Sequence, residues 1–202
     1  MGLLELIQNP LQLLYYAVAL LCAIVIHEFA HAWVANYLGD STPKKAGRVT
    51  LNPLAHLDPL GTLMLLLVRF GWGKPVPINP NNFKNPRLGS ALTAIAGPTS
   101  NFLFANLLAI IYKLLPISGT FLGELILITI FYSLVLMVFN LLPIPPLDGS
   151  KFFAIFFPAL ESRKYEIYGP FILIAFILVG GTTFLLPVIE FLLNVMGINI
   201  NL

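Results

Sequence analysis

Long apolar stretches separated by short polar loops dominate this chain. Each is long enough for a membrane-spanning helix, which needs about 20 apolar residues. The simplest interpretation is four full spans with both termini outside. We therefore expect an all-α integral membrane protein: a polytopic helical bundle with about four to six transmembrane segments, forming a single domain over residues 1–202. The stretches are Leu11–Leu38, Leu88–Leu115, Phe121–Leu142 and Tyr168–Met196.

Several shorter segments modify this picture. Pro59–Val68 is apolar but too short to cross a bilayer, so residues 43–60 and their continuation are expected to form a re-entrant or β-like loop. Within it, Gly47–Asn52 alternates with period two and predicts a strand edge that could receive an extended substrate. Phe152–Leu160 is expected to stay on the cytoplasmic side. Gly180-Gly181 and Pro187 could split the last stretch into two short helices.

Composition supports a membrane environment. Hydrophobic residues make up 58% of the chain and charged residues 10%, with a mean hydropathy of +0.88, whereas soluble domains carry about 25% charged residues. The net charge is only +2 and the basic residues are confined to short loops, so a lipid bilayer and not nucleic acid is the expected partner. The single cysteine, Cys22, excludes an intramolecular disulfide.

The basic loops predict topology. The first Lys or Arg is Lys44, so the first stretch lacks the positive start of a signal peptide and is expected to remain as an uncleaved span. The positive-inside rule places the loops that follow the first span in the cytoplasm. The localisation that fits is a prokaryotic cytoplasmic membrane, with the active site in its cytoplasmic half. The basic residues of these loops are Lys44, Lys45, Arg48, Arg69, Lys74, Lys84 and Arg87.

Polar residues interrupt the first span at His27-Glu28-Phe29-Ala30-His31. Ionisable groups at membrane depth are costly and usually functional. On a helix, His27 and His31 lie one turn apart on one face and can reach a single ion, while Glu28 is rotated by about 100°. A catalytic zinc usually has three protein ligands and one open position. Asp148 is the strongest candidate for the third ligand, because a proline-rich segment delivers it at the depth of the histidines; the others are Asp40, His56, Asp58 and Glu124.

Each of these residues also has a structural interpretation. The two histidines could be satisfied groups in helix packing, and Asp148 could cap a turn before Gly149. Asn101 and Asn140 could hold helices together by hydrogen bonds. His56 could be an accessory ligand, a partner of a ligand, a regulator or a structural loop histidine, and we leave it out of the metal set.

Three motifs in order carry a resemblance. His27-Glu28-Phe29-Ala30-His31, Gly97-Pro98-Thr99-Ser100-Asn101 and the segment from Asn140 through Pro143, Pro145 and Pro146 to Asp148-Gly149 match the HExxH, GPxxN and NxxPxPxxDG patterns of the site-2 proteases. The chain thus resembles these intramembrane zinc metalloproteases, peptidase family M50, over a motif-bearing core of about residues 10–150. It looks like the compact form, without a PDZ or CBS domain.

The resemblance implies that His27, His31 and Asp148 bind one Zn²⁺ and that Glu28 is the general base. Asn101 and Asn140 become candidates for steadying the substrate or the oxyanion. The expected function is hydrolysis of peptide bonds in transmembrane or membrane-proximal protein substrates. Regulation would fall to a membrane partner on another chain. The alternative is a membrane metal carrier or sensor with the same ligands, which would have no need for Glu28 as a base.

Overall fold

The computed structural model describes residues 10–58, 61 and 73–198, and within them every regular element is helical. The elements in chain order are α2 (Pro10–Tyr37), α3 (Thr42–Lys45), η1 (Pro53–Ala55), η2 (Pro80–Asn82), α5 (Pro86–Leu114), α6 (Phe121–Asn140), α7 (Asp148–Phe153), η3 (Pro158–Glu161), α8 (Arg163–Leu178), η4 (Gly181–Leu185) and α9 (Leu186–Val195). The prediction of an all-α, polytopic helical protein is confirmed.

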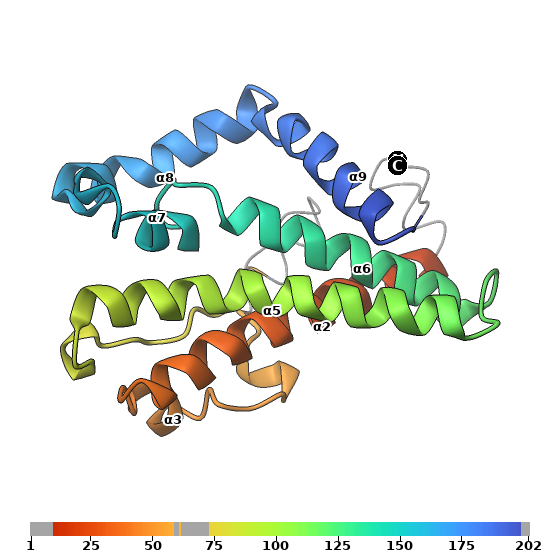
Figure 1. The fold of residues 1–202 in the computed structure, drawn as a ribbon, viewed down its shortest axis with the longest axis horizontal. Helices are drawn as coiled ribbons and strands as arrows, with labels where there is room; N and C mark the ends of the chain where they lie inside the picture. Colours follow the sequence, from red (N-terminus) through yellow and green to blue (C-terminus); the bar gives the residue numbers. More distant parts are fainter. Residues whose placement is uncertain (1–9, 59–60, 62–72, 199–202) are drawn as a thin grey trace.

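Three helices, α2, α5 and α6, are long and apolar enough to cross a membrane, and they match the first three predicted spans closely. They pack pairwise against one another, with α5 running opposite to α2 and α6 (Figure 1). Alanines are prominent where these helices meet. Small side chains let helix backbones approach closely, which is how helices associate in lipid. The fully or almost fully buried alanines are Ala19, Ala23, Ala32 and Ala35 of α2 and Ala91, Ala94, Ala105 and Ala109 of α5.

Local sequence explains where the long helices begin. Asn85 precedes α5, its side chain accepts a hydrogen bond from the Leu88 amide, and Pro86 occupies the first helical position. Thr120 caps α6 in the same way by accepting from the Gly123 amide. Such caps satisfy amides that the helix itself leaves without partners.

The last predicted crossing is split, as its glycines and proline suggested. Helix α8 and the segment Gly181–Val195, which consists of η4 and α9, meet at an angle of 83°, and counting this bent pair as one span gives up to four spans. Gly180 at the break has a φ of 78°, in the left-handed region that glycine adopts at little cost. In Figure 1 the pair forms an arm over α6. Helix α9 inserts Ile189 and Leu193 into a core that includes Ile130 and Leu134 of α6.

The predicted strand at Gly47–Asn52 is wrong, because the structure has only turns and bends there. Side chains occupy two of the backbone groups that a strand partner would need: the Thr50 carbonyl accepts from His56, and the Asn52 amide donates to the Thr50 hydroxyl. Among the described residues, the loops between α2 and α5 contain one isolated antiparallel bridge, Leu57 with Gly73. The predicted re-entrant segment Pro59–Val68 falls almost entirely outside the described residues.

The bundle brings three separate segments to one end. The second half of α2, the first half of α5 and the chain after α6 meet there, because α2 and α6 run in the same direction (Figure 1). The segment predicted to stay on one side, Phe152–Leu160, also lies here as the end of α7 and the start of η3. The three motifs noted in the sequence thus lie within reach of one another.

Candidate metal centre

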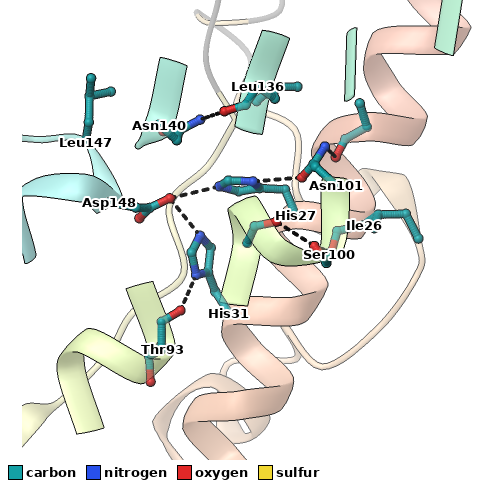
Figure 2. Close-up of polar contacts among 12 residues, drawn as sticks. Ile26, His27, His31, Thr93, Ser100, Asn101, Leu136, Asn140, Leu147 and Asp148 are labelled. Carbon is teal, nitrogen blue, oxygen red and sulfur yellow. Dashed lines mark hydrogen bonds and ion pairs between the residues drawn. The ribbon is translucent and has the colours of Figure 1, made fainter. Parts of the chain in front are cut away.

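His27, His31 and Asp148 form a cluster in which the ligand atoms of all three lie within 4.8 Å of one another (Figure 2). The Nε2 atoms of His27 and His31 lie 3.0 and 3.2 Å from Asp148 Oδ2. The two imidazole rings are nearly perpendicular, with centroids 4.6 Å apart. Both histidines are buried, at 4% and 6% exposure. We call these three residues the metal cluster.

The remaining ring nitrogens fix the tautomers. His27 Nδ1 donates to the Asn101 side-chain oxygen at 2.9 Å, and His31 Nδ1 donates to the Thr93 carbonyl at 2.7 Å. Because both partners are acceptors, each Nδ1 carries a proton, and in a neutral ring the Nε2 that faces Asp148 carries the lone pair. Metal-binding histidines are oriented by such partners.

Residues of helix α5 pack against the rings of both histidines and fix their positions. Asn101 is fully buried, and its amide nitrogen donates to the Ala23 carbonyl of α2 at 3.1 Å, so its orientation is fixed. A Cβ added at Gly97 would lie 2.4 Å from His31 Nε2 and 2.7 Å from His27 Cε1. Only glycine leaves room for both rings at this turn.

Asp148 reaches the cluster from the chain after α6. It is the first residue of α7 and follows the Pro143–Pro146 segment. Gly149 packs against the carbonyls of Leu141 and Leu142, and the Tyr165 hydroxyl of α8 donates to the Pro143 carbonyl. Burial alone would raise the pKa of Asp148, but His31 and His27 beside it hold that pKa well below its usual value. The carboxylate is therefore ionised and held in place.

This donor set fits a divalent cation. With both rings neutral, two Nε2 lone pairs converge on a carboxylate oxygen, and a bound cation stabilises that arrangement. Tetrahedral zinc with bonds of 2.0–2.1 Å separates its ligand atoms by about 3.3 Å. The two nitrogen–oxygen distances of 3.0 and 3.2 Å match this separation.

Glu28 lies next to the cluster in sequence and is half-buried. Its carboxylate forms no hydrogen bond or ion pair in the part of the chain that the structure describes. A carboxylate without a fixed partner is free to bind water or a proton.

Other residues singled out from the sequence lie elsewhere or are otherwise engaged. Asn140 donates to the Leu136 carbonyl of its own helix at 2.9 Å (Figure 2). His56 and Asp40 are fully buried within the loops that connect α2 to α5, where other loop groups hold them. Asp58 caps a turn by accepting from the Gly61 amide. Glu124 is exposed in the first turn of α6, at the opposite end of this helix from Asp148.

The sequence did not identify Gly97 or the Thr93 carbonyl as parts of the site. The nearest indication in the sequence was Pro98. A proline inside a helix leaves the carbonyl four residues earlier without a hydrogen-bond donor, and here that carbonyl belongs to Ala94. The carbonyl that binds His31 belongs to the preceding residue. Close approach of a ring to Gly97 depends on how α2 and α5 pack, which no local pattern shows.

Comparisons with known proteins give a relative that matches most of the chain. The chain is 40% identical over 194 residues to "Putative zinc metalloprotease YwhC" of Bacillus subtilis, covering 90% of this chain and 89% of that protein. The family model for peptidase family M50 matches residues 117–180. The chain belongs to peptidase family M50.

More distant members of the family share less of its length. The chain is 32% identical over 156 residues to "Putative zinc metalloprotease Rip2" of Mycobacterium tuberculosis, covering 74% of this chain and 59% of that protein. No solved structure matches the chain. As an M50 member the protein is a zinc metalloendopeptidase in a membrane, and Zn²⁺ is its cofactor.

Proposed function

We propose that this M50 protease is an intramembrane endopeptidase that cleaves transmembrane or membrane-proximal segments of other proteins. The observation that carries the proposal is the position of the metal cluster. Two of its residues lie inside α2, a helix of spanning length, and the third follows the end of α6. A peptide bond can reach such a site from within or beside the bilayer.

The proposal assigns a role to each residue at the site. His27, His31 and Asp148 hold the zinc, which when bound supplies a Lewis acid that activates water and polarises the scissile carbonyl. Glu28 accepts the proton of the attacking water and passes it to the leaving amine. Asn101 orients His27. Asn101 and Asn140 are also the proposed residues for binding the substrate or stabilising the oxyanion.

The substrate must change conformation before it is cut. Carbonyls within a transmembrane helix are hydrogen-bonded and shielded, so the cleaved segment has to unwind locally. The protein offers a route because both histidines lie within a few turns of the end of α2. A membrane partner could control which helices unwind there.

Charge supports a cytoplasmic position for this end of the bundle. Among the residues that the structure describes, the exposed basic residues gather at the end that holds the metal cluster, except Lys113 in the last turn of α5 at the other end. By the positive-inside rule the cluster then lies in the cytoplasmic half of a prokaryotic cytoplasmic membrane. The exposed basic residues at the cluster end are Lys44, Lys45, Lys74, Lys84, Arg87, Lys151, Arg163 and Lys164.

The proposal is tested with Glu28→Gln in purified, lipid-reconstituted protein. The assay follows cleavage of a single-span reporter peptide together with zinc per chain. We expect kcat to fall by about 10²–10⁴-fold, the usual contribution of a general base, while zinc content stays at the wild-type value. Glu124→Gln, at the opposite end of the bundle and exposed, is the matched control and should cleave normally.

Two outcomes would contradict the proposal. Wild-type cleavage by Glu28→Gln would remove Glu28 from the chemistry. A wild-type protein that binds zinc and moves it across the vesicle membrane, but cuts no membrane peptide, would favour the carrier alternative.

A further inference from the structure

A second buried polar group lies in the loops between α2 and α5. Arg48 is 3% exposed; its Nη1 donates to the Pro75 carbonyl at 3.0 Å and its Nη2 donates to the Lys74 carbonyl. His56 is fully buried and its Nε2 donates to the Thr50 carbonyl at 2.8 Å, so its Nδ1 is an acceptor. That Nδ1 lies 3.5 Å from Arg48 Nη2. We call Arg48 and His56 the loop clamp.

The loop clamp holds one stretch of backbone against α2. Besides the two carbonyls bound by Arg48, the Lys74 amide donates to the His56 carbonyl at 2.8 Å. The preceding residue, Gly73, lies against α2 so closely that an added Cβ would be 3.1 Å from Ile24 Cγ2 and 3.9 Å from Glu28 Cγ. The backbone at Gly73 is therefore a wall beside the Glu28 side chain.

Arg48 is a buried cation, and closing a loop does not by itself require one. Burying a guanidinium is costly unless it is paired, and Arg48 has no carboxylate within ion-pair distance among the described residues. Its Nε is buried, and no residue in the described part of the chain forms a hydrogen bond with it. Burial lowers the pKa of Arg48, and the negative charge of Glu28 raises it, so the two side chains are near enough to interact electrostatically. The negative charge that offsets part of this burial effect is that of Glu28.

We propose that Arg48 is a positioning residue for Glu28: by clamping Lys74 and Pro75 it holds Gly73 against α2 and confines the Glu28 carboxylate beside the metal cluster. The inference rests on the proposed role of Glu28 as the base. It adds a role for a loop cation that lies outside all three sequence motifs and makes no contact with the metal cluster.

Arg48→Ala is the direct test, measured as kcat and KM for the reporter peptide and as zinc per chain in reconstituted protein. Loss of positioning by about 1 Å costs on the order of 10²-fold in rate, so we expect kcat to fall by about 10- to 100-fold with KM and zinc content near wild type. Lys45→Ala is the matched control, since it removes an exposed cation from the same loop, and it should leave all three values unchanged.

Arg48→Lys separates the clamp from charge alone. Lysine keeps the positive charge but lacks the fork that reaches two carbonyls at once. We expect Arg48→Lys to resemble Arg48→Ala more than wild type. Full recovery of kcat by lysine would overturn the clamp.

Gly73→Ala provides a second route that leaves Arg48 intact and can be read even if Arg48→Ala fails to fold. Its methyl group presses on Ile24 and the His56 carbonyl and pushes the wall away from Glu28. We expect lower kcat with zinc retained. Wild-type kcat per zinc-loaded molecule in both Arg48→Ala and Gly73→Ala would overturn the proposal.

Coupling with Glu28 identifies the residue through which Arg48 acts. In a Glu28→Asp background, where the carboxylate is already displaced, Arg48→Ala should cost less than in wild type; equal, additive losses would contradict positioning. Glu28→Gln in the same assay keeps the two proposals apart. If it cleaves normally, the proposed role of Glu28 as the base fails; if it is inactive while Arg48→Ala is fully active, only the present inference fails.

Discussion

His31 and His56 are both buried histidines that donate to a backbone carbonyl, Thr93 in one case and Thr50 in the other. Their second ring nitrogens meet opposite partners. His31 Nε2 faces the Asp148 carboxylate at 3.2 Å, whereas His56 Nδ1 faces the Arg48 guanidinium. In a neutral ring, a lone pair that converges with a carboxylate can bind a metal ion together with it, whereas the guanidinium beside His56 Nδ1 repels a metal ion. Burial and one hydrogen bond therefore do not identify a metal ligand; the partner of the second nitrogen does.

The supporting elements differ in the same way. The metal cluster is built on long helices, where Gly97 and Asn101 fix the rings from the neighbouring helix. The loop clamp is built from short turns in which side chains hold carbonyls of another loop. Sites on packed helices are held more rigidly than sites on loops. The metal cluster thus has the geometry that a fixed coordination shell requires, and the clamp shapes its surroundings.

Replacing the two histidines in parallel gives the largest contrast. His31→Ala removes one of three proposed ligands, and we expect zinc per chain to fall close to zero and cleavage to disappear. His56→Ala removes a structural group, and we expect zinc content to stay at the wild-type value. Elemental analysis of the two purified variants measures the difference. Zinc loss in His56→Ala alone would reverse the roles assigned here.

Removing the hydrogen-bond partner of a metal-binding histidine should have an intermediate effect on zinc affinity. Asn101→Ala takes the acceptor from His27 Nδ1 and frees the ring to rotate, and losses of about 10- to 100-fold in metal affinity are typical of such changes. Competition with a zinc chelator measures the affinity. Asn106→Ala is the matched control, because Asn106 lies on the same helix and, within the described part of the chain, its side chain bonds only to the Phe102 carbonyl one turn earlier. Equal affinities of the two variants would show that the amide has no orienting role.

The sequence predicted the metal cluster better than the loops because the cluster depends on regular features. The four-residue spacing of His27 and His31 places both on one helical face, and the proline segment before Asp148 limits where that carboxylate can go. The three long spans followed from apolar length alone. Arg48 shows the opposite case. It was counted among the solvent-facing loop charges that set topology, yet the structure buries it, because its partners are carbonyls 26 and 27 residues away that no local pattern reveals.

The smallest predicted effect concerns Asp40, which joins the same two loops as the clamp. Its carboxylate accepts from the Thr42 and Asn79 amides and from the Asn82 side chain, at 3.0, 2.7 and 2.7 Å. Burial alone would raise the pKa of Asp40, but these hydrogen bonds outweigh it and hold the pKa below its usual value.

Asp40→Asn should lower the free energy of unfolding at pH 7 by about 1.5–3 kcal/mol, the range for hydrogen bonds to a charged group. A lowered folded-state pKa means that the carboxylate stabilises the fold above its unfolded pKa of about 3.9, and that this stabilisation is lost as the pH falls through the lower folded value. The difference between wild type and variant should therefore shrink below about pH 4. Denaturant unfolding in detergent across this range measures it, with Glu124→Gln as an exposed control. A difference that persists at low pH would mean that the amide disturbs packing, and that the charge of Asp40 is not what holds the two loops together.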